Sequence, residues 1–232
     1  MEAAVVNTLS PGDKAINATV GVFGNRFGII CERYGVDVTT LSFPFGTAVE
    51  TDKLRECIEE NPEVKILLAV GGWAFGSEPF RKLTENIFRM NGFVYDAIEF
   101  MRKHNFDGLD IDWEYPRGPD DRASFVSLIK ELRLAFEGEA KSTDNDKLLL
   151  TAAVPASFEA IAAGYDVPEL AKYLDYINVM AYDFHGKWES QAGHNAPLYA
   201  PSSDSEWRKQ LSVSFAAQMW TRLGAPKEKL VI

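Results

Sequence analysis

Residues 106–116 read FDGLDIDWEYP, a short stretch in which acidic and apolar side chains alternate. Successive side chains of a strand point to opposite faces, so a strand here places Asp110, Asp112 and Glu114 on one face. The other face then carries Leu109, Ile111 and Trp113. Because this apolar face needs covering, the pattern favours a strand inside a sheet over a solvated edge strand.

On both sides of this stretch, apolar runs of strand length alternate with amphipathic stretches. The runs are typical of strands buried on both faces, and they lie at residues 15–23, 36–43, 65–72, 106–113, 148–155, 176–182 and 230–232. Apolar residues recur at helical spacing between 87 and 101, 125 and 136, and 207 and 223, whereas residues 116–122 read as a loop. This alternation predicts an α/β fold with mostly parallel strands and right-handed crossovers.

Length and charge narrow the class of protein. The chain has 232 residues, one large domain or two small ones, and a formal charge of −10, which disfavours binding to nucleic acid or to an anionic membrane. It contains no apolar run of 18 or more residues, and residues 1–4 lack the pattern of a signal peptide. Its two cysteines, Cys31 and Cys57, are too few for a disulfide framework or a four-ligand zinc site.

The acid series points to proton-transfer chemistry. Same-face neighbours on a strand lie roughly 6.5–7 Å apart, and burying charged neighbours together should raise at least one pKa. A carboxyl group that stays protonated near neutral pH can act as a general acid. Glu114 comes last, at the carboxyl end of the strand, where α/β sites are built. A metal site is disfavoured, because three acids on one strand do not easily converge on one ion.

The pattern Asp107-x-x-Asp110-x-Asp112-x-Glu114 resembles the signature of glycoside hydrolase family 18, the chitinase family. Residues 67–73, 149–155 and 180–186 resemble the third, fifth and sixth strands of the family's barrel, and 229–232 resemble the first half of the seventh. The resemblance covers about residues 60–232 and is similar to animal-type chitinases. It implies a (β/α) TIM-type barrel, here incomplete or rebuilt, since a complete barrel needs eight strand–helix units.

The resemblance also implies a reaction: retaining, substrate-assisted hydrolysis of β-1,4-linked N-acetylglucosamine polymers. Glu114 would protonate the leaving oxygen, and the substrate's acetamide oxygen would attack the anomeric carbon. Asp112 would orient the acetamide N–H, and Asp110 would hold Asp112 and share its proton. Tyr182 would hydrogen-bond the acetamide oxygen. Chitin or its oligosaccharides are the implied partners, and the resemblance implies no cofactor.

Further positions would bind the sugar chain. Met180 and Asp183 would line the sugar site, and Trp73, Tyr115 and Trp188 would offer aromatic faces on which sugar rings pack. Trp73 could instead be a core residue, and Met180 could be core-facing support. His185 and His194 are not needed by this mechanism and read as loop or supporting residues.

The first 50 residues resemble a different family. Residues 5–14, 21–27 and 32–35 are similar to class V pyridoxal-phosphate aminotransferases of the alanine/serine–glyoxylate type. The resemblance includes neither that family's phosphate-binding turn nor its Schiff-base lysine, so we expect no pyridoxal phosphate. The sequence thus predicts a chimera: an aminotransferase-like βαβα segment at 1–59, joined to a chitinase-like barrel segment at 60–232.

Three outcomes remain open from the sequence: an enzyme of chitinase type, a non-catalytic chitin-binding protein, or a recombined fold without activity. Non-catalytic members of the family usually lack the terminal Glu of the series, which Glu114 supplies here. Missing barrel units predict an incomplete cleft, so we expect weak or absent activity. They also predict open sheet edges, which favour self-association. The family is often secreted, but with no signal peptide in this chain its compartment stays open.

Overall fold

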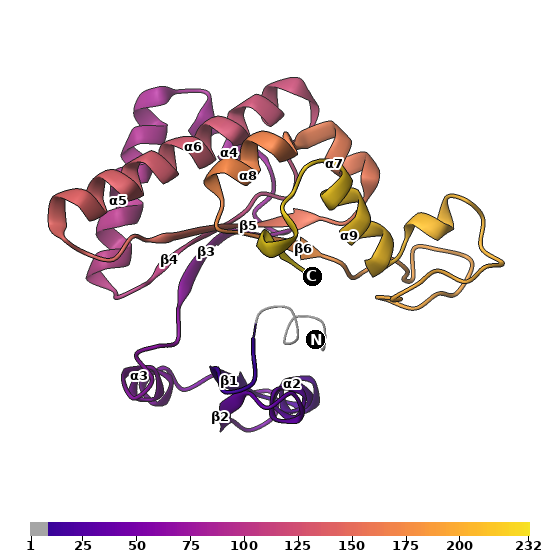
Figure 1. Cartoon of the computed structure of the whole chain (residues 1–232), viewed down its shortest axis with the longest axis horizontal. Helices are drawn as coiled ribbons and strands as arrows, with labels where there is room; N and C mark the ends of the chain where they lie inside the picture. Colours follow the sequence, from indigo (N-terminus) through magenta and orange to yellow (C-terminus); the bar gives the residue numbers. More distant parts are fainter. Residues whose placement is uncertain (1–8) are drawn as a thin grey trace. The chain divides into compact units, whose positions relative to one another are not determined.

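The computed structural model describes residues 9–232, apart from the Phe23 side chain, and divides into two compact units, Met1–Ile66 and Leu67–Ile232 (Figure 1). Each unit has its own parallel sheet. The signal-peptide prediction for residues 1–4 and the start of the aminotransferase-like stretch, residues 5–8, lie outside the described residues.

The N-terminal unit is one strand–helix–strand–helix module. Its elements are β1 (Lys14–Thr19), α2 (Val22–Arg33), β2 (Asp37–Ser42) and α3 (Thr51–Glu59). The two strands pair in parallel, with Lys14 opposite Asp37. A small apolar cluster of Ile30, Cys31 and Val36 lies at the end of α2 and before β2.

The predicted first strand, residues 15–23, is wrong at its end, because β1 stops at Thr19 and α2 begins at Val22. Glycines let this helix lie close to the strand. A Cβ on Gly24 would come within 2.1 Å of the Thr19 hydroxyl oxygen, and one on Gly28 within 2.8 Å of the Asn17 amide nitrogen. An apolar run can belong to a strand or to a buried helix, and periodicity alone does not separate them.

The C-terminal unit is a layer of helices on one side of a five-stranded sheet (Figure 1). Its strands are β3 (Leu67–Gly71), β4 (Gly108–Asp112), β5 (Leu149–Pro155), β6 (Tyr176–Met180) and β7 (Leu230–Val231). Its α-helices are α4 (Glu78–Thr84), α5 (Ile87–Lys103), α6 (Gly118–Thr143), α7 (Phe158–Gly164), α8 (Val167–Tyr173) and α9 (Val213–Arg222), and its 3₁₀ turns are η1 (Arg208–Gln210) and η2 (Lys227–Lys229).

The sheet of this unit has the strand order β3-β4-β5-β6-β7, and every neighbouring pair is parallel. Strands that follow chain order with helices on one side are the arrangement of a TIM-type barrel, of which this sheet is an incomplete part. The predicted fold class is therefore confirmed. β4 lies inside the sheet, between β3 and β5, so its side chains are flanked on both sides.

The expected loop over residues 116–122 is wrong beyond Arg117, because α6 begins at Gly118. Pro119 lies in the first turn, where its missing N–H loses no helical bond. The Asp121 carboxylate accepts the Arg117 backbone N–H at 2.8 Å, which satisfies a donor next to the helix end.

The last predicted helix starts later than its apolar pattern. Trp207 is half exposed and is followed by the 3₁₀ turn η1 (Arg208–Gln210), whereas α9 begins at Val213. Ser212 is its N-cap, since the hydroxyl accepts the Phe215 backbone N–H. The helical spacing of apolar residues thus begins at Trp207, before the helix itself, whose first residue is set by the capping Ser212.

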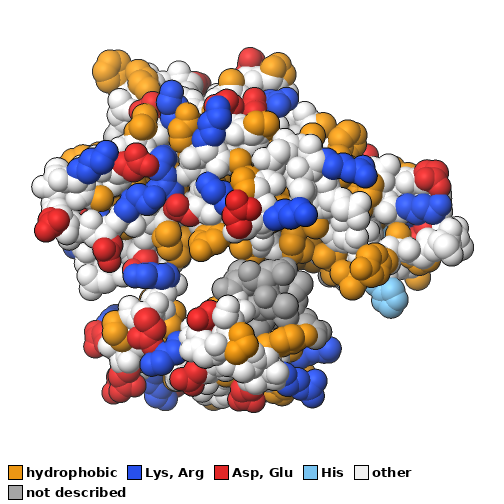
Figure 2. Space-filling view, in the orientation of Figure 1, with side chains coloured by type: hydrophobic (Ala, Val, Ile, Leu, Met, Phe, Trp, Pro, Cys, Tyr) orange, Lys and Arg blue, Asp and Glu red, His pale blue; other side chains and the backbone are white. Residues whose placement is uncertain are grey.

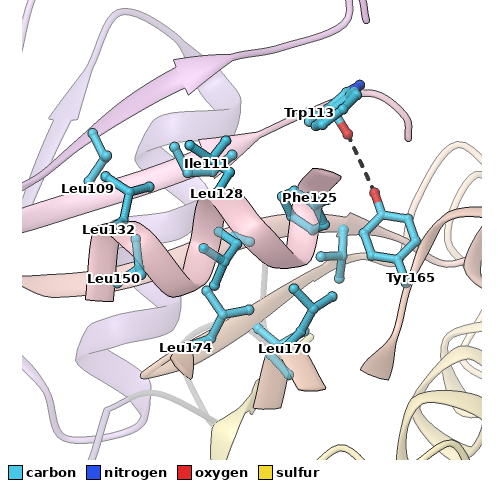
Figure 3. Packing of buried hydrophobic residues seen from close by; sticks show 14 of the residues in the cluster. Leu109, Ile111, Trp113, Phe125, Leu128, Leu132, Leu150, Tyr165, Leu170 and Leu174 are labelled. Atoms are coloured by element: carbon cyan, nitrogen blue, oxygen red, sulfur yellow. Dashed lines mark hydrogen bonds between the residues drawn. The ribbon is translucent and has the colours of Figure 1, made fainter. Parts of the chain in front are cut away.

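An aromatic ladder runs through the core of the C-terminal unit. Phe80 stacks on Trp113, which meets Phe125 edge-on; Phe125 in turn meets Tyr165, and Tyr165 meets Trp220. The ring centroids of successive pairs lie 5.1 to 5.9 Å apart. Figure 3 shows the Tyr165 hydroxyl reaching the Trp113 carbonyl oxygen, a distance of 3.4 Å. The ladder anchors the end of β4 to helices of the covering layer.

The surface shows no concentration of one charge on the drawn face. In Figure 2, Lys, Arg, Asp and Glu side chains are interspersed over the helices of the C-terminal unit. Among the described residues, no helix is long and apolar enough to cross a membrane.

The five-stranded sheet ends at β3 and β7, each hydrogen-bonded to a single neighbouring strand in the described chain. Unpaired edge groups can pair with another chain. We therefore expect the protein to self-associate. Size-exclusion chromatography with light scattering should give a mass above 25.9 kDa that falls on dilution. A monomer whose mass does not change with concentration would contradict this prediction.

Candidate active site

The end of β4 presents the acid series as its alternation predicts. Leu109, Ile111 and Trp113 are fully buried on the helix-covered side. Asp110 and Asp112 are partly exposed on the opposite face, and Glu114 follows just beyond the strand. One face of β4 therefore packs the core while the other carries the ionisable groups.

Asp110 is held by two polar side chains from the neighbouring strands. Thr151 of β5 donates its hydroxyl to Asp110 Oδ1, and Asn178 of β6 donates its amide to the same atom at 2.9 Å. Sequence reasoning missed both. The available signal was a polar residue inside each apolar run, which a buried strand retains only where it has a partner.

Asp112 is partly removed from solvent at the end of β4. Burial raises its pKa to about 6, and the nearby charges of Glu114 and then Asp110 add to the rise. The expectation that at least one pKa of the series is raised is thus confirmed. Within the described chain, the buried atom Asp112 Oδ1 has no hydrogen-bond partner. A buried acceptor without a partner is costly, so this oxygen is available to a ligand's donor.

The glycine pair after β3 lets the chain pass close to Asp112. The Gly72 backbone N–H donates to the Asp112 carbonyl oxygen at 2.8 Å, and both glycines have positive φ. A Cβ on Gly71 would lie 1.9 Å from that oxygen. Only glycine fits there, so the close approach that places Trp73 beside the acids depends on it.

Asp112 makes the stability of the chain depend on pH. Its pKa rises on folding from 3.8 to about 6, so between these two pH values the folded state binds more protons than the unfolded state. The free energy of unfolding therefore falls as pH rises from about 4 to about 6. Replacing Asp112 with Asn removes this loss. We expect the variant's advantage in Tm to be absent near about pH 4, to grow up to about pH 7, and to change little above that. Thermal denaturation across this range checks it, and an advantage that is constant with pH would contradict it.

A cleft of about 740 Å³ opens beside the acid series. The cleft brings together seven of the nine predicted site residues: Trp73, Glu114, Tyr115, Met180, Tyr182, Asp183 and Trp188. The other two, Asp110 and Asp112, belong to β4 itself and are not among its lining residues. The arrangement combines a carboxyl group with aromatic and polar side chains from β3, β4 and β6.

The aromatic side chains of the cleft are open to solvent. Trp73 is 77% exposed, Trp188 63% and Tyr182 53%. The alternative of a core role for Trp73 is therefore wrong, and Met180 lines the cleft at the end of β6 rather than serving only as core support. Exposed aromatic rings beside a cleft are a feature of sites that bind ligands with apolar faces.

The two tyrosines of the cleft stay protonated. Burial raises the pKa of Tyr115, and a hydrogen bond with Glu114 adds to the effect. Burial also raises the pKa of Tyr182, followed by the charges of Asp112 and Glu114. Both phenols therefore keep their O–H groups at physiological pH and can donate hydrogen bonds into the cleft.

A smaller pocket of about 280 Å³ continues from Glu114 and contains side chains that sequence reasoning missed. Arg81 and Arg117 line it together with Ser77. The Arg81 guanidinium binds the Asp121 carboxylate through two nitrogens at 2.8 to 3.1 Å, which ties α4 to the start of α6. Nothing in the local sequence pairs these two residues, which are brought together by the fold.

No group of three or more His, Cys, Asp or Glu side chains among residues 9–232 is arranged to hold a metal ion. The acids of β4 point along one strand face instead of converging on a point. The cleft itself is lined by carboxyl, phenol and aromatic groups, among other side chains.

The strands are parallel and follow chain order, as in a TIM-type α/β protein. Its cleft combines an acid that follows an inner strand with exposed aromatic rings. The chain belongs to the glycosyl hydrolases family 18, whose family model matches residues 26–232. This match begins well before residue 60, where sequence reasoning placed the start of the resemblance.

Curated relatives share most of this chain. Chitotriosidase-1 of Mus musculus is 43% identical over 184 residues, which cover 78% of this chain and 40% of that protein. The probable endochitinase of Caenorhabditis elegans is 46% identical over 171 residues, 73% of this chain and 28% of that protein. The chain spans less than half the length of these relatives.

Solved structures agree with the fold. A chitinase of Trichuris suis, TsES1, described as immunomodulatory and active, superimposes with a TM-score of 0.74 at 39% identity, over 78% of this chain and 49% of that one. Human YKL-39, described as a pseudo-chitinase with retained chitooligosaccharide binding properties, gives a TM-score of 0.74 at 38% identity, over 78% and 50%. The neighbours therefore include both a chitinase and a pseudo-chitinase.

Proposed function

We propose that this chain is a chitinase-type glycosidase that hydrolyses β-1,4-linked N-acetylglucosamine polymers with retention of configuration. One observation carries the proposal: the acid series ends at Glu114 in an aromatic cleft, while the buried Asp112 Oδ1 lacks a hydrogen-bond partner in the described chain. A sugar that brings an N–H donor, such as an acetamide, supplies what that oxygen needs.

Each acid has a separate role in the proposed reaction. Glu114 donates its proton to the glycosidic oxygen as the bond to the anomeric carbon breaks. The acetamide oxygen of the same sugar attacks that carbon and forms an oxazolinium ion, which water then opens. Asp112 accepts the acetamide N–H and balances the positive charge. Asp110, held by Thr151 and Asn178, shares the proton of Asp112.

The remaining cleft residues bind the sugar chain. Tyr182 donates its O–H to the acetamide oxygen, and its raised pKa supports this role. Asp183 and Met180 line the sugar site beside it. Trp73, Tyr115 and Trp188 offer rings for the C–H faces of the sugars. The exposure of Trp73 and Trp188 supports their role as platforms.

A second candidate function is chitin-oligosaccharide binding without catalysis. The observation that favours it is the likeness to human YKL-39, described as a pseudo-chitinase with retained chitooligosaccharide binding. Glu114 favours catalysis instead, because it places a proton donor on the cleft wall. The two functions share their ligand and differ in whether a bond is broken.

Release of a fluorescent group from a chitobiose or chitotriose conjugate separates these functions. We expect turnover by the unaltered chain and none by Glu114→Gln. Binding of chitotetraose without turnover would overturn the proposed hydrolysis in favour of the second candidate. Neither binding nor turnover would make the chain a fold without activity and would overturn both.

We also propose that residues 1–59 form an aminotransferase-like segment joined to a barrel segment at 60–232. The separate parallel sheet of the N-terminal unit supports this division, although the family match from residue 26 runs across the join. The tryptic peptide at residues 56–65 crosses it. Its detection by mass spectrometry in the source organism would support a natural fusion, and finding only peptides from two separate proteins would contradict it.

A further inference from the structure

The segment between β6 and α9, residues 181–212, contains a cluster of buried charges that the proposed reaction does not use. It has only one 3₁₀ turn, η1, yet it supplies Tyr182, Asp183 and Trp188 to the cleft. A long irregular segment needs specific contacts to hold functional side chains in place. The contacts of this one centre on Glu189.

Two side chains contact the Glu189 carboxylate at the same oxygen. His185 Nδ1 lies 2.7 Å and Arg208 Nη1 lies 3.2 Å from Glu189 Oε2. The side chains of His185, Glu189 and Arg208 are 3%, 14% and 10% exposed. The hydrogen bond from His185 is the main cause that lowers the pKa of Glu189, so this carboxylate stays ionised.

Arg208 ties the cluster to the rest of the segment. Its Nη2 donates to the Ala192 carbonyl oxygen at 3.3 Å, and its Nε lies 3.6 Å from Asp204 Oδ1. Asp204 is itself only 7% exposed. One guanidinium thus connects three parts of a segment that lacks a regular hydrogen-bond ladder.

The His185–Glu189 bond closes a five-residue turn that carries Trp188. The Glu189 backbone N–H donates to the Gly186 carbonyl oxygen at 3.1 Å, which tightens the turn. The Trp188 indole lies over Gly186 so closely that a Cβ there would come within 2.3 Å of the ring. The imidazole is packed in the same way by Gly193, where a Cβ would come within 2.4 Å.

We propose that His185, Glu189 and Arg208 are positioning residues that hold Trp188 as a preformed platform for a pyranose ring of the substrate. This inference rests on the proposed function and goes beyond it, since it assigns a role to three side chains that are not among the lining residues of the cleft. A platform that is already ordered does not lose side-chain freedom on binding. Removing the contacts that hold Trp188 should therefore weaken substrate binding and leave the rate of bond cleavage unchanged.

The test compares Glu189→Ala with Glu189→Gln and with a matched control, Glu206→Gln. Glu206 lies in the same segment but is exposed and pairs only with Lys209 in the described chain. For a chitotriose conjugate we expect Glu189→Ala to raise KM by about threefold to tenfold while kcat changes less than about twofold. Glu189→Gln, which keeps an acceptor, should recover part of the loss, and the control should match the unaltered chain.

A double-mutant cycle shows whether the effect passes through Trp188. In a Trp188→Ala background, Glu189→Ala should raise KM no further, because the platform is already absent. If the two changes add fully, or if Glu189→Ala lowers kcat and KM stays constant, the cluster has a general structural role and the proposal is overturned.

Limited trypsin digestion provides a readout that does not depend on catalysis. Lys187 lies within the closed turn, so its peptide bond should be cut faster in Glu189→Ala than in the unaltered chain or in Glu206→Gln. Faster cleavage in a chain that neither binds nor hydrolyses chitotriose would leave the positioning role standing and reject the proposed function. Equal cleavage in all three proteins would overturn the positioning role itself.

Discussion

Replacing Glu114 with Gln is expected to lower kcat on a chitotriose conjugate by about 10²- to 10⁴-fold. Gln has nearly the same shape as Glu but carries no proton that it can give to the leaving oxygen. The side chain lies on the wall of the cleft, so its volume and hydrogen-bonding reach are retained. Binding of chitotetraose, measured by calorimetry, should change by less than about threefold, because the aromatic platforms stay in place.

The matched control is Glu99→Gln, on the exposed face of α5 and away from the cleft lining. It removes the same charge and should leave kcat and KM unchanged. Equal rates for Glu114→Gln and the unaltered chain would show that the proton comes from another group. A loss of binding as large as the loss of rate would show that Glu114 acts mainly by holding the sugar.

Replacing Phe125 with Ala is expected to destabilise the C-terminal unit by about 3–5 kcal/mol. Phe125 is 1% exposed and meets Trp113 and Tyr165 edge-on in the middle of the aromatic ladder. Its removal leaves a cavity between β4 and the covering helices, which the packed rings cannot fill without moving. Because Trp113 ends the acid-bearing strand, activity should be lost at a lower urea concentration in this variant.

Urea unfolding followed by tryptophan fluorescence measures this effect in one unit. All five tryptophans lie at or beyond Trp73, so the signal comes from the C-terminal unit alone. Phe88→Ala is the matched control, because Phe88 on α5 is 83% exposed and should cost less than about 0.5 kcal/mol. A change below about 1 kcal/mol for Phe125→Ala would show that the ladder contributes little to stability.

Much of the fold followed from short-range patterns. Alternation in residues 106–116 correctly placed Leu109, Ile111 and Trp113 in the core and the acids on the open face. Apolar runs located the seven strands of residues 9–232, because buried parallel strands are apolar along their length. The predicted aromatic and polar residues line one cleft because the carboxyl ends of parallel strands lie at the same edge of the sheet.

The errors and omissions come from contacts that local spacing does not encode. The predicted strand at residues 15–23 ran on into Val22 and Phe23 because both are apolar, although α2 begins there. The close packing of α2 on β1 depends on Gly24 and Gly28. Thr151 and Asn178 reach Asp110 only through the register of three strands. The charges around Glu189 meet across an irregular segment with no periodicity at all.

In the proposed reaction, Glu114 and the acids of β4 hydrolyse the substrate with help from its own acetamide. Proton NMR of the first sugar ends released from chitohexaose tests this most directly, because the anomeric configuration records the mechanism before it equilibrates. We expect the β-anomer to form first, as two successive inversions at one carbon require. First formation of the α-anomer would contradict it, and so would the absence of any new reducing end when chitohexaose is bound.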